Sequence, residues 1–178
     1  MKASVFVGAS VDGFIARTDG TLDFLDHAGS EPHGYDEFIA TVDAIVMGRN
    51  TLEIVLGFKM WPFKKPVFVL STHPLPALPS GASAERLEGE PADVVAQLEA
   101  RGFGSIYVDG GITIQRFLDA GLIDRLIVSR VPVLVGSGIP LFGPLTHDVV
   151  LRHVATRQFA SGLVQTEYAI AKPTTARP

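Results

Sequence analysis

The stretch Ile45-Val46-Met47-Gly48-Arg49-Asn50-Thr51 passes abruptly from apolar residues to a glycine, a cation and two small polar residues. The apolar, β-prone residues 44–47 predict a buried strand. The polar residues that follow predict a tight turn and a helix, which Asn50 could cap together with Glu53 and which Gly57 could end. Strand, turn and helix in this order form the repeating unit of α/β folds.

The same alternation continues in both directions along the chain. Further buried strands are expected at residues 3–9, 67–70, 105–108 and 126–135, and helices at residues 35–42, 93–101 and 111–121. Two β-rich runs, residues 151–159 and 163–171, meet at Ser161-Gly162 and predict a hairpin. The sequence therefore predicts a three-layer α/β/α fold, in which a mostly parallel, mixed central sheet carries the antiparallel hairpin at one edge.

Composition limits the kind of protein. A chain of 178 residues, 47% of them apolar, suits one domain, expected at residues 1–172, with a disordered tail at residues 173–178. The net charge of -4 argues against non-specific binding to nucleic acids. The absence of cysteine excludes disulfides and thiolate metal sites, and the five histidines lack metal-ligand spacing, so no metal is predicted.

The N-terminal residues lack the long apolar region and the cleavage site of a signal peptide. No run of about 18 apolar residues occurs, so no membrane-spanning helix and no membrane partner are expected. These features predict a cytoplasmic protein.

Two turns have the chemistry of a phosphate site: Gly48-Arg49-Asn50-Thr51, and Asp109-Gly110-Gly111-Ile112-Thr113. Each follows a predicted strand and opens a predicted helix, where free N-H groups attract anions. Gly48 permits close approach of a ligand, and Arg49 can pair with a phosphate through two N-H groups. Ordinary turns with a surface cation are the alternative interpretation, because neither stretch is a GxGxxG motif. Two such turns on one sheet suit a dinucleotide.

Five stretches, in this order and spacing, carry a resemblance to a known family. They are S-V-D-G-F-I-A from Ser10, V-M-G-R-N-T from Val46, Y-V-D-G-G from Tyr107, F-L-D-A-G-L-I-D from Phe117 and P-V-L-V-G-S-G-I-P-L-F from Pro132. Together they resemble the dihydrofolate reductase superfamily, in particular the branch that contains the reductase domain of bifunctional riboflavin-biosynthesis enzymes. The resemblance covers nearly the whole chain.

The resemblance implies an NADPH-dependent reductase that transfers a hydride to a small heterocyclic or related metabolite. It places the first turn at the adenosine-side phosphates, Ser71 and Thr72 near the adenosine, the second turn at the pyrophosphate, and Ile15 and Ala16 beside the nicotinamide. The cofactor-binding residues expected on this basis are Ile15, Ala16, Gly48, Arg49, Asn50, Thr51, Ser71, Thr72, Gly110, Gly111, Ile112 and Thr113. Relatives in this branch are often dimers, so a homodimer is expected.

The sequence offers two candidates for the proton donor. Folate reducers carry a carboxylate early in the helix before M-G-R, and the matching place here falls near Gly34 or Tyr35. Asp12 and Asp109 are the candidate catalytic residues, although Asp12 could simply form a turn and Asp109 could simply stabilise a helix start. A non-catalytic nucleotide-binding module that kept the fold is therefore the alternative function.

Overall fold

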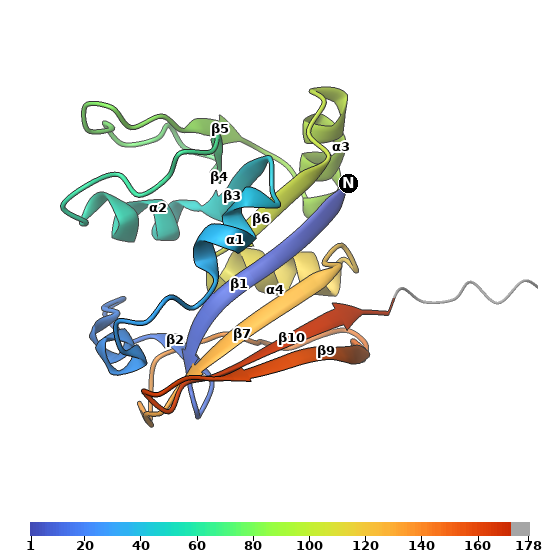
Figure 1. The fold of residues 1–178 in the computed structure, drawn as a ribbon. Coiled ribbons are helices and arrows are strands. Elements are labelled where there is room, and N and C mark those ends of the chain that lie inside the picture. The colour runs from blue at the N-terminus through green and yellow to red at the C-terminus, as the bar shows by residue number, and fades with distance from the viewer. Residues whose placement is uncertain (172–178) are drawn as a thin grey trace, which may run out of the picture.

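A computed structural model describes residues 1–171. Its main strands are β1 (Lys2–Ser10), β3 (Ala44–Gly48), β4 (Val67–Leu70), β5 (Glu85–Leu87), β6 (Ser105–Asp109), β7 (Arg125–Val131), β9 (Leu151–Gln158) and β10 (Val164–Ile170). They form one eight-stranded sheet in the order β5-β4-β3-β6-β1-β7-β10-β9 (Figure 1). The strands from β5 to β7 are parallel, and β10 and β9 join antiparallel. The predicted mixed sheet with a terminal hairpin is confirmed.

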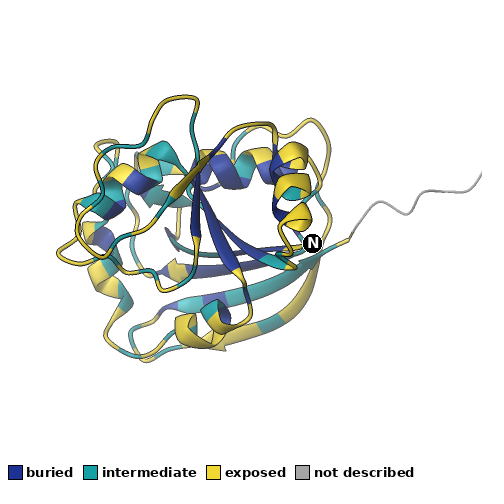
Figure 2. Ribbon diagram, turned by 90° about the horizontal axis from the view of Figure 1, so that it is seen from above, coloured by how far each residue is buried: buried dark blue, intermediate teal, exposed yellow. Residues whose placement is uncertain are grey.

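Helices cover both faces of the sheet, because its strands carry apolar side chains on both sides. These helices are α1 (Tyr35–Ala40), α2 (Arg49–Leu56), α3 (Pro91–Ala100) and α4 (Gly111–Asp119). On one face Phe38 of α1 and Leu52 of α2 pack against the sheet, and on the other face Leu98 of α3 and Phe117 of α4 do so. Figure 1 shows α1 in front of the sheet and α4 behind it, and Figure 2 shows buried residues concentrated in the central strands. The fold has the three predicted layers.

Two short strands lie outside the main sheet. They are β2 (Phe14–Ala16) and β8 (Ile139–Pro140), which pair antiparallel with each other. A 3-10 helix, η1 (Asp23–Ala28), buries Phe24 in a small cluster with Val131 and Leu163. Among residues 1–171 no helix is long and apolar enough to cross a membrane. The tail predicted at residues 173–178 lies outside the described residues.

Three sequence-based predictions of local structure were wrong. The helix after β3 begins at Arg49 with Gly48 as its N-cap, and Glu53 pairs with Arg49, so Asn50 does not form a capping box. The strand expected at residues 126–135 ends at Val131, immediately before Pro132, because proline has no N-H group to continue the pairing. The strands β2 and β5 lie in segments where no strand was predicted.

Candidate active site

Three neighbouring strands bring three predicted segments to one edge of the sheet. β3 lies between β4 and β6 and runs parallel to both. Ser71 and Thr72 follow β4, Gly48 ends β3 at the start of α2, and Gly110 follows β6 at the start of α4. Because parallel strands end at the same edge, residues distant in sequence come together here.

The starts of α2 and α4 touch each other in a crossed arrangement. A Cβ atom on Gly110 would lie 2.1 Å from Oγ1 of Thr51, and one on Gly48 would lie 3.0 Å from Oγ1 of Thr113. Each glycine therefore makes room for the threonine of the opposite helix. The close approach sets the first-turn N-H groups of two helices side by side, and such groups bind anions.

Neither of these two helix starts is capped by a side chain. Gly48 and Gly110 occupy the N-cap positions of α2 and α4, and no side-chain hydrogen bond closes either end. By contrast, α3 begins with a full capping box made by Glu90 and Asp93. The chain thus caps α3 with its own carboxylates and leaves the starts of α2 and α4, like that of α1, without a side-chain cap.

Arg49 reaches from the start of α2 to the turn after β4. Its guanidinium group donates to Oε1 of Glu53 at 2.9 Å and to the carbonyl of Pro74 at 2.7 Å. In that turn, Oγ of Ser71 donates to the carbonyl of His73 at 2.8 Å. The carbonyl of Thr72 accepts from Arg86 on β5 at 3.3 Å. Two guanidinium groups therefore flank the turn that follows β4.

The other predicted cofactor-binding residues differ in exposure. Ile112 is 65% exposed and Asn50 is exposed, whereas Thr113 and Ala16 are buried. The side chain of Ile15 lies against Gly111, where an added Cβ would be 2.9 Å from its Cδ1 atom. The structure therefore places Ile15 at the start of α4, beside the second glycine turn.

Asp12 holds two loops together. Its carboxylate accepts a hydrogen bond from Oγ of Ser10 at 2.6 Å and from the N-H groups of Val135 and Gly136 at 3.1 and 2.7 Å. The hydrogen bond from Ser10, assisted by the two backbone donors, lowers the pKa of Asp12 to about 2. Asp12 is thus ionised at neutral pH and anchors the loop before β2 to the loop before β8.

Asp109 occupies a different environment at the end of β6. Burial raises the pKa of its carboxyl group, and a hydrogen bond from the Gly110 N-H group at 2.8 Å and the neighbouring Tyr107 hydroxyl oppose this rise. The Tyr107 hydroxyl donates its hydrogen to the carbonyl of Phe6, which lies 2.9 Å away. The charge of Asp109 also acts on Tyr35, at the first position of α1. Of the two predicted acids, Asp109 is the one whose environment favours the protonated form.

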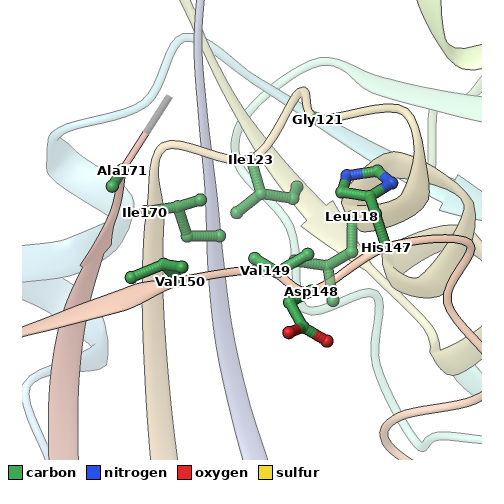
Figure 3. A pocket seen from close by; sticks show the side chains of 9 residues that line it. All are labelled: Leu118, Gly121, Ile123, His147, Asp148, Val149, Val150, Ile170 and Ala171. Carbon is green, nitrogen blue, oxygen red and sulfur yellow. The ribbon is translucent and has the colours of Figure 1, made fainter. Parts of the chain in front are cut away.

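Two cavities within residues 1–171 lie away from these helix starts. One, of about 310 Å³, lies between α4 and the beginning of β9 and is lined by Leu118, Ile123, Val149, Ile170 and neighbouring residues (Figure 3). The other, of about 450 Å³, is lined by Trp61, Phe63 and other residues that follow α2. Within residues 1–171 no group of three or more acidic or histidine side chains could hold a metal ion.

Comparison with known proteins identifies the family. The RibD C-terminal domain family matches residues 2–165, which is nearly the whole chain. The chain belongs to the RibD C-terminal domain family. A crystal structure of a family relative from Shewanella sp. PV-4 is 40% identical, covers 96% of this chain and 99% of that one, and superposes with a TM-score of 0.87.

More distant solved structures share the fold. One is the diaminohydroxyphosphoribosylaminopyrimidine deaminase/5-amino-6-(5-phosphoribosylamino)uracil reductase of Thermotoga maritima, with a TM-score of 0.74 at 15% identity over 96% of this chain and 56% of that one. Another is the dihydrofolate reductase of Enterococcus faecalis in complex with NADP(H), with a TM-score of 0.68 at 14% identity over 95% of this chain and 96% of that one. The RibD-like chain thus has a reductase-type, dihydrofolate reductase-like fold, as the sequence predicted.

The sequence analysis assigned no role at the site to three residues that the structure places there. Arg86 lies on β5, a strand hidden in a proline-rich segment without an apolar pattern. Tyr107 and Tyr35 lie beside Asp109. Tyr107 could have been found from the period-2 alternation, which sets it on the same side of β6 as Asp109. Only the packing of α1 on the sheet brings Tyr35 to the same place.

Proposed function

We propose that this protein is an NADPH-dependent reductase that transfers a hydride to a small heterocyclic or related metabolite. The observation that carries the proposal is the crossed contact of the α2 and α4 starts, Gly110 with Thr51 and Gly48 with Thr113. Two open helix starts and a nearby guanidinium group fit a ligand with phosphates at more than one place. The reductase-type fold of the family supports the same conclusion.

In this proposal each segment binds one part of the cofactor. Gly48, Asn50 and Thr51 bind the adenosine-side phosphates, and Arg49 pairs with the 2′-phosphate that distinguishes NADPH from NADH. Ser71 and Thr72 lie beside the adenosine. At the turn Gly110-Gly111-Ile112-Thr113 the pyrophosphate lies against Gly110, whose N-H group donates to Asp109, and accepts from the N-H groups of the residues that follow it. Ile15 and Ala16 border the nicotinamide. NADPH supplies a hydride to an electron-poor C=N or C=O bond of the substrate.

The protein then supplies a proton to the substrate heteroatom, so that one hydride and one proton complete the reduction. We assign this step to Asp109, whose burial raises its pKa and so favours the protonated form before transfer. Solvent restores the proton afterwards. Asp12, with a pKa of about 2, would not donate a proton at neutral pH, and its part in the proposal is to fix the loop before β2.

Calorimetric titration with NADPH and NADH tests the proposal. We expect NADPH to bind to the wild-type protein below millimolar concentration and to raise its melting temperature. Arg49→Gln should weaken NADPH binding by about 10- to 100-fold, the value of a charge-assisted hydrogen bond, and should change NADH binding little. Arg152→Gln, on the exposed strand β9, is the matched control. A wild-type protein that does not bind NADPH would refute the proposal.

Substrate-dependent oxidation of NADPH tests the reaction itself. The 5-amino-6-(5-phosphoribosylamino)uracil and dihydrofolate are suitable trial substrates, because the fold relatives act on or are named for them. Reduction of either substrate would show that the protein is an enzyme and would exclude the alternative function of a non-catalytic nucleotide-binding module.

We also propose that residues 1–172 form a single domain that acts as a cytoplasmic homodimer. β9 lies at the edge of the sheet and exposes Leu151 and Val154 by 40% and 47%, and an apolar edge strand of this kind favours pairing with another chain. Sedimentation analysis should give a dimer, and a monomer at all concentrations would contradict this part of the proposal.

A further inference from the structure

The middle of β1 is more exposed than its position in the sheet predicts. β1 is an interior strand between β6 and β7, yet Phe6, Val7 and Gly8 at its centre are only partly buried. Interior strands of a three-layer fold are normally covered on both faces. Phe6 contacts Phe38 of α1, which has only six residues, so the partly exposed side chain of Phe6 lies on the α1 side of the sheet, whereas Val7 packs on the opposite face.

Tyr35 stands at this exposed centre of β1. It is the first residue of α1, and its ring lies 5.7 Å from that of Phe6 and 6.5 Å from that of Tyr107, edge to face in both pairs. Tyr107 is 6% exposed and Phe38, the remaining ring of the group, is 2% exposed, whereas Tyr35 is 36% exposed. Tyr35, together with the partly buried Phe6 beside it, is therefore the part of this aromatic group that a ligand can reach.

The hydroxyl of Tyr35 is available for a ligand. Within residues 1–171 no group hydrogen-bonds to it, unlike the Tyr107 hydroxyl, which donates to the carbonyl of Phe6. Burial and the nearby charges of Asp109 and Asp36 raise the pKa of Tyr35 to about 12. At neutral pH the hydroxyl is thus an uncharged group that can both donate and accept a hydrogen bond.

We propose that Tyr35 recognises the substrate, and that it selects an uncharged, flat heterocycle bound over Phe6 beside Asp109. This inference rests on the reductase function proposed above and adds the residue that hydrogen-bonds to the substrate ring. A phenol can hydrogen-bond to a carbonyl or ring N-H group of a neutral ring. Unlike a carboxylate at the same helix position, it cannot offset the charge of a protonated ring.

Calorimetric binding of two ring probes to the NADPH-loaded protein tests the inference. The probes are uracil, which is neutral, and 2,4-diaminopyrimidine, measured at a pH where its ring is protonated. We expect the wild-type protein to prefer uracil. Tyr35→Phe should weaken uracil binding by about 3- to 10-fold, the value of one hydrogen bond between neutral groups. Tyr35→Asp should reverse the preference towards the charged ring.

Tyr168→Phe is the matched control, because Tyr168 lies on β10 and its ring contacts His153, away from the aromatic group of Tyr35. Melting temperatures verify that each variant is folded, and Tyr35→Phe remains informative if Tyr35→Asp does not fold. Equal affinity of uracil for wild type and Tyr35→Phe, or no uracil binding by the NADPH-loaded wild type, would overturn the inference. Failure of NADPH itself to bind would instead refute the reductase proposal, so the two failures are distinguishable.

Discussion

Substitution of Gly110 by alanine tests whether the crossed contact of α2 and α4 is as tight as the structure shows. Gly110 has a φ of 90°, which a residue with a Cβ atom rarely adopts, and this strain costs about 1–3 kcal/mol. The new methyl group would also lie 2.1 Å from Oγ1 of Thr51, and overpacking of this kind costs about 1–3 kcal/mol more. We therefore expect Gly110→Ala to lower the free energy of unfolding by about 2–6 kcal/mol.

Gly102 provides the matched control for the backbone strain. Its φ is 87°, and nothing lies within 4 Å of the position of its Cβ atom, so Gly102→Ala should show the strain alone. The remaining cost of Gly110→Ala, which comes from the clash with Thr51, should depend on the residue at position 51. In a Thr51→Ala background, which removes the Oγ1 atom, Gly110→Ala should cost about 1–3 kcal/mol less than in the wild type.

Urea unfolding followed by circular dichroism, without cofactor, gives the free energies. The reasoning fails if Gly110→Ala is no more destabilising than Gly102→Ala, or if the Thr51→Ala background leaves its cost unchanged.

Two predictions concern the acidic residues. Burial raises the pKa of Asp109, so the stability that its protonated form contributes is present below the unfolded pKa of about 3.9 and is lost as the pH rises through the folded pKa. Asp109→Asn should therefore have a higher free energy of unfolding than wild type at neutral pH, by about 1.4 kcal/mol for each pH unit by which the folded pKa exceeds the unfolded one. Urea unfolding across a pH series should show this difference in free energy between variant and wild type disappearing below about pH 4. Asp12 behaves oppositely: its folded pKa of about 2 lies below the unfolded one, so its contribution is present above about pH 4 and is lost as the pH falls towards 2. Asp12→Asn should lower the stability at neutral pH and should remove the part of the stability loss that Asp12 causes between about pH 4 and pH 2. A melting temperature that falls with acid in Asp12→Asn as steeply as in the wild type would contradict this role of Asp12.

The long elements of the fold were predictable because each has a local signal. Buried parallel strands such as β4 are continuous apolar runs, and α4 repeats apolar residues at helical spacing. Short elements lack such a signal: β5 consists of Glu85, Arg86 and Leu87, and it pairs only because the edge of β4 is available. The start of α2 was misplaced by two residues, because Gly48 and not Asn50 is the N-cap and Glu53 binds Arg49, a choice that the capping pattern does not encode.

The candidate site also has features that were predictable from the sequence and features that were not. The glycine turns at the ends of β3 and β6 were visible in the sequence, since strand ends and helix starts follow from local patterns. Their contact with each other was not, because it depends on β3 and β6 being neighbours in the sheet. The grouping of Tyr35 with Phe6 and Tyr107 joins three elements separated by many residues, and only tertiary packing specifies it.

The missing caps of α2 and α4 connect the stability of this protein to its ligand. A side-chain cap contributes about 0.5–2 kcal/mol, and α3 has one, formed by Glu90 and Asp93. Leaving two helix starts open therefore costs the free protein about 1–4 kcal/mol. A ligand present at a hundred times its dissociation constant restores about 2.7 kcal/mol by binding to the folded state. Under the proposed function the first-turn N-H groups that follow Gly48 and Gly110 are completed by the phosphates of a bound dinucleotide, so NADPH should stabilise the folded protein.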